Sequence, residues 1–425
     1  MRADVKRDDT FLGSGLTFLF LQGVASPLFA RLADELDARG HRCVRVNFCA
    51  GDRLFWRRPG AINYRGRYDE WPAFLREILA VENITDLVLF SDVRPMHGLA
   101  CQEALNLGLR IHVFEEGYLR PYCLSLDFGG ANANSSLPRS AEALAAAASA
   151  NPLSCRSVDP VPISMVRRAA WDVANHAANL TMPWLHPHYR SHRPYHPMRE
   201  LFGWSRRIFR RHALGEKRRH LRRLGFFLAS GTPFFFVPLQ LDSDAQVVKH
   251  SDFLDIEEFL GEVFASFARY APTPMNLVVK CHPLDNDLVP RGGQTARLAA
   301  RHGLASRVLF IDGGHLPTLL AKTRGLVTIN STVTTSAFDH GCPVKALGRA
   351  IYNFPGLASQ VSLDEFWRNP TAPDPRVHRD FCDVLFSRCL IRGSYYSDKG
   401  ISLAIPSIVS LLEKRASAQQ VPRRQ

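Results

Sequence analysis

Residues 16–48, LTFLFLQGVASPLFARLADELDARGHRCVRVNF, decide the fold class. The run 16–23 is apolar and ends in glycine, as a buried strand does, and 27–40 carries a helical pattern that stops at Gly40. A second strand, CVRVNF, follows at 43–48. Strand, helix and strand in this order predict a parallel sheet of the Rossmann type. The sequence has no GxGxxG fingerprint, so we expect no dinucleotide cofactor.

Strands and helices continue to alternate beyond this opening, in two cycles. The second cycle starts with the strand FFFVPLQ at 234–240. Between the cycles, 140–157 is rich in alanine without an apolar pattern, and the stretch up to Glu200 mixes proline, histidine and tryptophan, so we interpret this region as an inserted loop. The other expected elements are helices at 71–81, 98–107, 256–270 and 294–302 and strands at 86–90, 111–114, 276–283, 307–312 and 326–330.

The two cycles predict an α/β fold with two Rossmann-like domains facing a cleft. This is the architecture of glycosyltransferase B enzymes and equally of other two-domain α/β enzymes. We expect an N-terminal domain over 1–225 with the inserted loop at about 140–200, a C-terminal domain over 226–400, and a final helix and tail over 401–425. The fold alone does not fix the reaction.

Composition narrows the class of protein. The nine cysteines are scattered without a CxxC pair, and no cluster of residues has the spacing of metal ligands, so we expect neither a metal nor a cofactor. The charged N-terminus lacks the apolar core of a signal peptide, and no apolar run reaches about 18 residues. We therefore expect a cytoplasmic protein that spans no membrane.

Positive charge is concentrated in one segment. The formal charge of +13 predicts an anionic partner, and residues 205–223, SRRIFRRHALGEKRRHLRR, hold eight arginines and one lysine against a single glutamate. Because Ile208, Leu214 and Leu221 recur about every seventh residue, a helix here has an apolar stripe between basic flanks. It either binds an anionic membrane surface or forms a solvated helix that links two domains. Nucleic acid is not an expected partner, because the sequence has neither an RNA-binding aromatic motif nor a helix-turn-helix pattern.

Two carboxylates follow a strongly apolar strand in the segment PLQLDSDAQ. Asp242 and Asp244 come directly after the strand that ends at Gln240. Ligands of open α/β sheets bind at the carboxyl ends of strands, and two neighbouring carboxylates there can supply a nucleophile or a general base. The same residues also fit a turn that caps the next helix.

Two more strands of the second cycle end in polar residues. One ends in KCHP, where Lys280 and His282 can neutralise a phosphate and protonate its leaving oxygen. The other ends at Asn330, after which Ser331 and Thr332 start a helix whose amides can bind a phosphate. A simple helix cap explains these last residues equally well. The presence of all three segments at strand ends of one domain favours a shared site.

The order of several motifs resembles that of the KpsS/LipB family of capsule polysaccharide proteins. The motifs are LFLQG, NFCAGDRLFW, SDVRP, VFEEGYLRP, VPLQLDSDAQ, HSDF, KCHP, INSTV and LDEFW, and the resemblance runs from about Leu16 to Gly400. It implies a retaining β-Kdo transferase, where Kdo is 3-deoxy-D-manno-oct-2-ulosonic acid, with CMP-Kdo as donor. The implied acceptor is a phosphatidylglycerol-type lipid on which a capsule linker begins.

The resemblance also implies roles for individual residues. The QxxxD motif of the family falls on Gln240 and Asp244, which makes Asp244 the expected nucleophile and Asp242 the alternative. The HP motif falls on His282 and Pro283 and implies CMP binding, with His282 as a catalytic residue. The implied donor-binding set is Gln240, Asp242, Lys280, Pro283, Asn330, Ser331 and Thr332.

Two further motifs extend this set. The S-x5-A-L motif falls on Ser331 and Ala337, with Phe338 in place of leucine. The acidic pair of FEEGYLRP resembles an acid motif of the family, so Glu116 or Glu115 is expected to act as acid or base, or to position the acceptor.

Charge and resemblance together suggest the partners. The Kdo carboxylate and the CMP phosphate give a purpose to Lys280 and His282, and also to Arg120 and Arg94. A phospholipid acceptor explains the basic segment, which would hold the protein peripherally on the inner face of the membrane, with other capsule biosynthesis and export proteins as further partners. The alternative is a non-catalytic capsule assembly or export factor that binds lipid-linked glycan.

Overall fold

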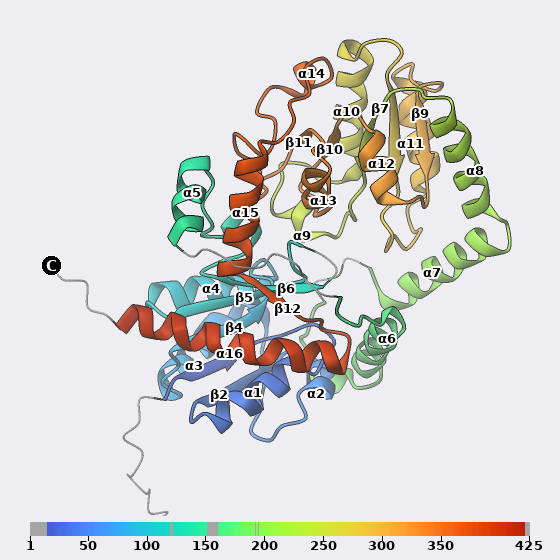
Figure 1. Ribbon diagram of the computed structural model, residues 1–425. Coiled ribbons are helices and arrows are strands. Elements are labelled where there is room, and N and C mark those ends of the chain that lie inside the picture. Colours follow the sequence, from blue (N-terminus) through green and yellow to red (C-terminus); the bar gives the residue numbers. More distant parts are fainter. Residues whose placement is uncertain (1–14, 120–121, 151–159, 192, 194, 421–425) are drawn as a thin grey trace, which may run out of the picture. The chain divides into compact units, whose positions relative to one another are not determined.

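A computed structural model describes the chain except for residues 1–14, 120–121, 151–159, 192, 194 and 421–425 (Figure 1). The chain forms two compact units. Unit 1 contains 1–115, 160–190 and 391–425, and unit 2 contains 116–159 and 191–390. This division differs from the expected boundary at 225, because the chain passes between the units several times. The α/β fold class with a parallel sheet in each unit is confirmed.

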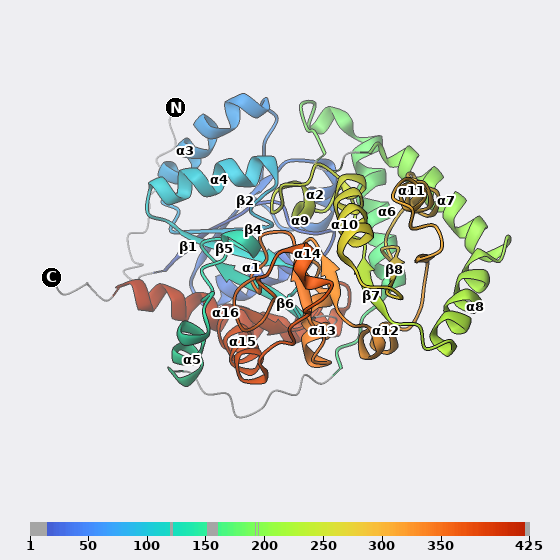
Figure 2. The ribbon, with the colours of Figure 1, turned by 90° about the horizontal axis from the view of Figure 1, so that it is seen from above.

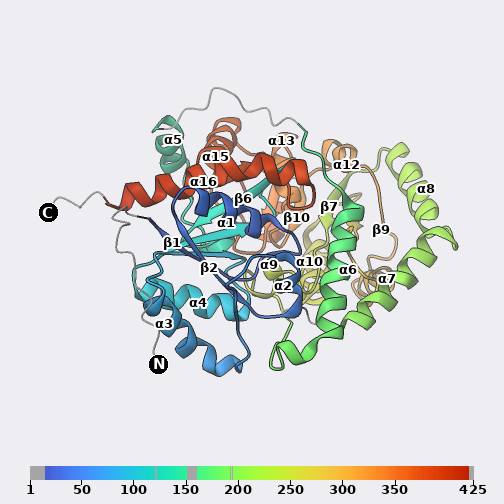
Figure 3. The same ribbon diagram turned by 90° about the horizontal axis from the view of Figure 1, so that it is seen from below.

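Unit 1 contains a parallel sheet in the strand order β5-β4-β1-β2-β3. Its strands are β1 (Thr17–Phe20), β2 (Arg42–Asn47), β3 (Ile62–Asn63), β4 (Asp86–Phe90) and β5 (Arg110–Glu115). Its helices are α1 (Leu28–Ala38), α2 (Ala50–Phe55), η1 (Tyr68–Glu70), α3 (Trp71–Val81), α4 (Pro95–Asn106), α6 (Met165–Thr181), η3 (Pro183–Leu185) and α16 (Asp398–Gln420). Helices α3 and α4 lie on one face of the sheet, and α1 and α16 lie on the other (Figures 2 and 3).

The C-terminal helix therefore packs on the first unit, far from it in sequence. Asp398, at the start of α16, forms ion pairs with Arg31 of α1 at 2.7 Å and with Arg167 of α6 at 2.5 Å. Near its other end, Glu413 pairs with Arg39 at 3.4 Å. These contacts explain why the expected final helix belongs to the unit that begins the chain.

Unit 2 contains a second parallel sheet in the order β11-β10-β7-β8-β9. Its strands are β7 (Phe234–Pro238), β8 (Asn276–Lys280), β9 (Val308–Ile311), β10 (Leu326–Thr328) and β11 (Val344–Ala346), while β6 (Cys123–Phe128) precedes them and β12 (Leu390–Arg392) crosses the boundary at 390. Its helices are η2 (Asn132–Asn134), α5 (Ala141–Ala150), α7 (Pro197–His212), α8 (Glu216–Ala229), α9 (Ala245–Val248), α10 (Ile256–Tyr270), α11 (Arg291–Arg301), α12 (Leu316–Lys322), α13 (Val333–Asp339), α14 (Leu363–Phe366) and α15 (Pro375–Arg388).

The central strand β7 is buried on both sides, which fixes the position of the site at its end. Phe234 and Phe236 join one apolar cluster with Leu319 of α12, and Phe235 joins another with Phe259 of α10. Because successive strand side chains point to opposite faces, a continuous run of phenylalanine suits a strand covered by helices on both faces. The strand and helices expected in this region are confirmed, and α10 has the expected bounds.

The interpretation of 140–200 as a loop is wrong, because this region contains α5, α6 and the start of α7. Alanine has the highest helix propensity, so an alanine-rich segment without an apolar stripe can still be helical. In α5, Leu144 is fully buried against the unit 2 core. The basic segment 205–223 is also not one helix, because α7 ends before Gly215, which has φ +64° and separates it from α8.

A buried histidine makes unit 1 sensitive to acid. His97 in the first turn of α4 is 1% exposed, and its Nδ1 lies 2.9 Å from the carbonyl oxygens of Phe90 and Ser91. Burial, with a smaller contribution from Arg94, lowers the pKa of His97 to about 3 from its usual 6.5. The unfolded chain therefore binds a proton that the folded chain excludes, and the stability gained from neutral His97 is lost as the pH falls below 6.5.

We predict that the urea concentration at which half of the protein is unfolded is lower at pH 5 than at pH 7. The cost is about 1.4 kcal/mol for each pH unit below the unfolded pKa of such a histidine. The variant His97→Asn, whose amide nitrogen can donate to the same carbonyl groups, should lose less stability over this range. An identical pH dependence in the two proteins would contradict the assignment.

Candidate functional site in unit 2

Three neighbouring strand ends form the candidate site. In the sheet of unit 2, β7 lies between β10 and β8, with Pro238 opposite Lys280. The chain builds β8 and β9 on one side of β7 and then crosses to β10 on the other side, so the strand order reverses between β7 and β10. In open α/β sheets, the crevice at the carboxyl ends of two such strands binds the ligand.

A buried pair of amides joins the two strands at this crevice. Gln240 Nε2 donates to Asn330 Oδ1 at 3.2 Å, and the backbone N–H of Asn330 donates to Gln240 Oε1 at 3.0 Å. Both side chains are 4% exposed. Asn330 Nδ2 also donates to the carbonyl oxygen of Gln246 in α9 at 2.8 Å. These two predicted donor-binding residues therefore hold β7, β10 and α9 in place.

The two aspartates of the segment have different surroundings. Asp242 Oδ1 accepts the backbone N–H of Ile256 at the start of α10, and its Oδ2 forms an ion pair with Arg291, whose side chain is 5% exposed. Asp244 is half-buried, and its Oδ1 accepts the backbone N–H of Gln246 at 2.9 Å. Both oxygens of Asp242 thus stabilise the fold, whereas the bond of Asp244 is local to the first turn of α9.

The KCHP segment leaves β8 next to this crevice. His282 Nδ1 accepts the backbone N–H of Leu284 at 3.1 Å, so a neutral ring has its proton on Nε2, where it can be donated. Pro283 is exposed. Burial lowers the pKa of Lys280, and no ion pair of Lys280 occurs within the described part of the chain. Burial also raises the pKa of the neighbouring Cys281 thiol to about 12.

The polar residues after β10 act partly as a helix cap. Ser331 Oγ accepts the backbone N–H of Val333 at 3.2 Å, and the carbonyl oxygen of Ser331 accepts the Tyr352 hydroxyl at 2.8 Å. Thr332 is half-buried at the N-terminus of α13. Ser331 thus binds the N–H of the first residue of α13, although the N-cap residue is Thr332, which makes no side-chain cap hydrogen bond. Phosphate binding stays a prediction.

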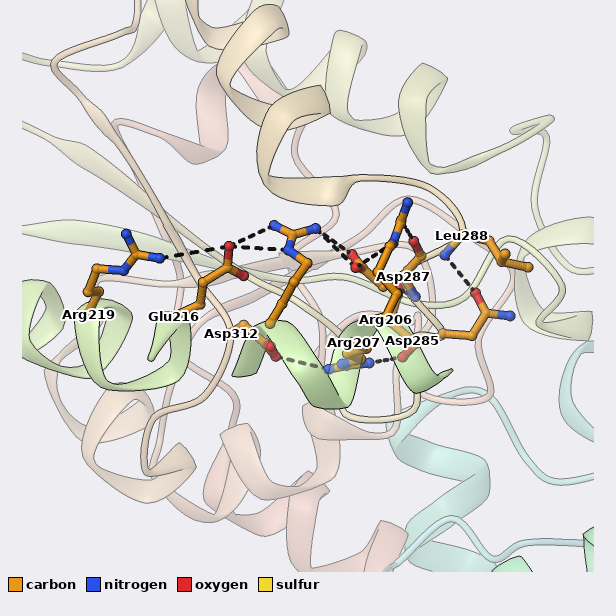
Figure 4. Close-up of polar contacts among 10 residues, drawn as sticks. Arg206, Arg207, Glu216, Arg219, Asp285, Asp287, Leu288 and Asp312 are labelled. Atoms are coloured by element: carbon orange, nitrogen blue, oxygen red, sulfur yellow. Dashed lines mark hydrogen bonds and ion pairs between the residues drawn. The ribbon is translucent and has the colours of Figure 1, made fainter. Parts of the chain in front are cut away.

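Arg207 has a structural role next to the candidate site that the sequence interpretation did not predict. Its guanidinium donates to the carbonyl oxygen of Asp285 and to Asp312 Oδ1 at 2.9 Å (Figure 4). It also donates to the carbonyl oxygen of His282 at 3.2 Å. The side chain is 4% exposed. Arg207 thus fixes the main chain on which His282 stands. One sequence feature could have predicted its buried position, because Arg207 follows Gly203 by four residues and therefore lies on the same face of the helix.

The arginines in the first half of the basic segment form ion pairs within unit 2. Asp287 pairs with Arg206 at 3.2 Å and with Arg210 at 3.0 Å, and Arg210 also pairs with Glu216 (Figure 4). A cavity of about 280 Å³ lies among these groups. Its charged lining consists of Arg207, Arg210, Arg211, Arg219, Arg223, Arg291, His220, Glu216, Asp285, Asp287 and Asp312.

The remaining predicted residues lie elsewhere. Arg94, in unit 1, donates to Gln22 Oε1 at 3.2 Å and to the Gly23 carbonyl oxygen at 3.0 Å, between the ends of β1 and β4. Glu115 ends β5, and its carbonyl oxygen accepts the Tyr395 hydroxyl at 2.9 Å.

Two expected residues of the EEGYLRP motif complete the set. Glu116 is half-buried and starts unit 2, while Arg120 lies outside the described residues. The motif thus spans the division between the units. Its role in the site stays a prediction.

Within the described ranges, His, Cys, Asp and Glu do not form a group of three or more that could hold a metal ion. No described helix is both long and apolar enough to cross a membrane.

Fold and site together define a Rossmann-type α/β protein with a pair of buried polar side chains at the strand crossover of its second sheet. Residues 85–396 match the family model described as "Capsule polysaccharide biosynthesis protein". The chain belongs to this family, which confirms the resemblance drawn from its motifs.

Curated relatives cover almost the whole chain. "Capsule polysaccharide export protein KpsS" of Escherichia coli is 32% identical over 392 residues, which cover 91% of this chain and 98% of the relative. "Capsule polysaccharide modification protein LipB" of Neisseria meningitidis serogroup B is 34% identical over 401 residues, covering 91% and 93%. The solved structure "Thermosulfurimonas dismutans KpsC, beta Kdo 2,7 transferase" aligns with a TM-score of 0.44 and 15% identity over 93% of this chain and 99% of that one.

Removal of the Arg207 side chain should weaken the fold. We predict that Arg207→Ala lowers the free energy of unfolding by about 2 kcal/mol, because the Asp285 carbonyl oxygen loses its Arg207 donor. Asp312 keeps its ion pair with Arg211, and the His282 carbonyl oxygen keeps the Asp285 N–H. The matched control is Arg218→Ala on the exposed surface of α8, which should change stability by less than about 0.5 kcal/mol. Urea unfolding measures the stability of both variants, and equal stabilities would contradict the structural role of Arg207.

The two aspartates should also differ in stability. Asp242→Asn removes the closer of the two carboxylates that pair with buried Arg291, the other being Asp285 at 3.6 Å, so we expect a loss of about 2 kcal/mol. Asp244→Asn retains an oxygen that accepts the Gln246 amide, and we expect the smaller loss of the two variants. Urea unfolding of the two variants at pH 7 tests the difference, and the reverse order would show that the structural roles are exchanged.

Proposed function

We propose that the protein is a glycosyltransferase that transfers β-Kdo from CMP-Kdo, with retention of configuration, to a phosphatidylglycerol-type lipid at the start of a capsule linker. Membership of the capsule polysaccharide biosynthesis family supports a role in the synthesis of a capsule. The observation that carries the proposal is the convergence of the QxxxD, HP and S-x5-A segments at neighbouring strand ends of unit 2, joined by the Gln240–Asn330 pair.

In this proposal Asp244 is the nucleophile. Its carboxylate attacks the anomeric carbon of Kdo, the bond from that carbon to the CMP phosphate oxygen breaks, and the His282 Nε2 proton passes to the departing phosphate. Glu116 or Glu115 takes the proton of the lipid hydroxyl, which then displaces Asp244 from the sugar. Two inversions give retention. The structural bonds of Asp242 favour Asp244 over Asp242 for this role.

Anionic groups of the donor suit the cations near the crevice. Lys280 is half-buried, and burial lowers its pKa, so a bound phosphate or carboxylate would offset the cost of desolvating its charge. The formal charge of +13 likewise suits a protein that works peripherally on the anionic inner face of the membrane. Pro283, Ser331 and Thr332 complete the proposed CMP site, Arg94 and Arg120 are proposed to position substrate, and we propose no resident cofactor.

A second candidate function follows from the name of the Escherichia coli relative, a capsule polysaccharide export protein. In that case the chain binds lipid-linked glycan and assembles with other capsule proteins without transferring a sugar. The two candidates differ in one observable, because a transferase releases CMP from its donor and an export factor does not.

The deciding experiment is a donor assay. We expect wild-type protein to release CMP from CMP-Kdo, and not UDP from UDP-sugars, and to form a Kdo-lipid with a lysophosphatidylglycerol acceptor, detected by mass spectrometry. Asp244→Ala should reduce the rate about a thousandfold or more, since the covalent step is lost. The exposed neighbour variant Ser243→Ala is the control and should retain its rate.

Three outcomes would each contradict a part of the proposal. Full activity of Asp244→Ala removes this residue as nucleophile. No CMP release by wild-type protein, combined with binding of lipid-linked glycan, favours the export factor. NMR of the product gives the anomeric configuration, and an inverted product would contradict the double displacement.

A further inference from the structure

Helix α7 has its apolar side chains on its exposed face. At 100° per residue, Met198, Leu201, Phe202, Ile208 and Phe209 share one side of the helix. Their exposed fractions are 56% to 65%, although side chains of this kind are usually buried. Five large apolar groups in one stripe form a continuous surface, and such surfaces mark sites of interaction with a protein or a membrane.

The opposite face of α7 is charged and packs against unit 2. Arg207 is buried on the loop that follows β8, and Arg206 and Arg210 pair with Asp287 in the same loop. Gly203 lies on this face too, and a Cβ atom there would come within 2.4 Å of the Asn286 carbonyl oxygen. The close approach and the ion pairs fix the rotation of the helix, so the apolar stripe stays outward.

The next helix adds exposed positive charge and another exposed aromatic ring. Arg218, Arg222 and Arg223 of α8 are exposed, and none of them has an ion pair within the described ranges. Phe226, on the same helix, is 76% exposed. Arg199 near the start of α7 is also exposed and without an ion pair in the described part of the chain. Basic side chains close to exposed apolar ones are typical of helices that lie in an anionic membrane surface.

We propose that the exposed face of α7, defined by Met198, Leu201, Phe202, Ile208 and Phe209, inserts into the headgroup region of an anionic lipid bilayer. The exposed arginines of α8 contact the lipid phosphates. The surplus of arginine favours a bilayer over an apolar protein partner, because bilayer phosphates neutralise these charges wherever they reach the surface.

This assignment changes the expectation drawn from the basic segment. Arg206, Arg207 and Arg210 hold α7 on unit 2 and are not the lipid contacts, which fall to the apolar stripe and to α8. The inference deepens the proposed function in one respect, since a lipid acceptor requires access to a membrane. The exposure and packing of the stripe do not depend on the identity of the donor sugar.

The test is flotation of the full-length protein with vesicles. Wild-type protein should bind vesicles of phosphatidylglycerol and phosphatidylethanolamine more tightly than vesicles of phosphatidylcholine, and less tightly at high salt. The double variant Phe202→Ser/Phe209→Ser should bind at least about tenfold more weakly. Leu105→Ser/Leu107→Ser, which removes two side chains of 62% and 55% exposure in unit 1, is the matched control and should bind as wild type does.

A second pair of substitutions separates charge from insertion. Arg218→Ala/Arg222→Ala should weaken binding to the anionic vesicles and reduce its salt dependence, while binding to phosphatidylcholine stays unchanged. Unaltered vesicle binding by Phe202→Ser/Phe209→Ser overturns the proposal. A second result also overturns it. If light scattering shows that the wild-type protein is a dimer and the variant a monomer, and both bind vesicles equally, the stripe is an interface between two copies.

Vesicle binding and donor chemistry can fail independently. CMP release without vesicles should be equal in wild type and Phe202→Ser/Phe209→Ser, and Asp244→Ala should bind vesicles as wild type does. Loss of vesicle binding with intact CMP release therefore concerns α7, and loss of CMP release with intact binding concerns the transferase proposal.

Discussion

Arg207 places a buried guanidinium among the carbonyl groups of the loop that follows β8, and much of unit 2 is arranged around it. One residue holds α7, the main chain at His282 and Asp285, and the carboxylate of Asp312 after β9. Desolvating an arginine is costly, and the cost is offset here because its hydrogen bonds are made to fixed acceptors. The position of His282 at the sheet edge therefore depends on a helix more than 70 residues earlier in the chain.

The amide pair of Gln240 and Asn330 has a comparable role at the strand crossover. Parallel strands that lie on either side of a crossover diverge beyond their last ladder bond, and the pair joins β7 and β10 beyond that point. Unit 1 shows the same strand order with different chemistry, since Arg94 contacts Gln22 and Gly23 between β1 and β4. Each unit thus uses a polar side chain to hold the crevice that its own topology creates.

The sequence predicts the central strands of both sheets and several helices, because periodicity is a local property, but it does not predict β3, β6, β11 and β12. The bounds of α3 and α10 agree with the pattern, as does the position of β7. Helices α5 and α6 were missed, since alanine and scattered polar residues give no stripe, and the units were divided differently because α16 returns to α1 through contacts between distant residues.

The candidate site shows the same limit. Motifs identify Asp242 and Asp244 together, but only the partners of Asp242, Ile256 and Arg291, show which aspartate is structural. Those partners are 14 and 49 residues away, so spacing within the motif could not reveal them. The arginines of α7 were likewise assigned to lipid because their acidic partners lie in a separate loop.

The distribution of charge around the KCHP loop has a consequence for its lysine. Asp285, Asp287 and Asp312 face arginines from α7 and α11, so the acidic groups nearest the loop are largely neutralised. Lys280 is half-buried beside them, and burial lowers its pKa, since the nearby carboxylates compensate too little for the loss of water. A cation in this situation is stabilised by an anion supplied from outside the chain. The arginines that fix the loop thus neutralise the nearby carboxylates, and Lys280 has little negative charge close to it. A phosphate or carboxylate ligand would supply that negative charge.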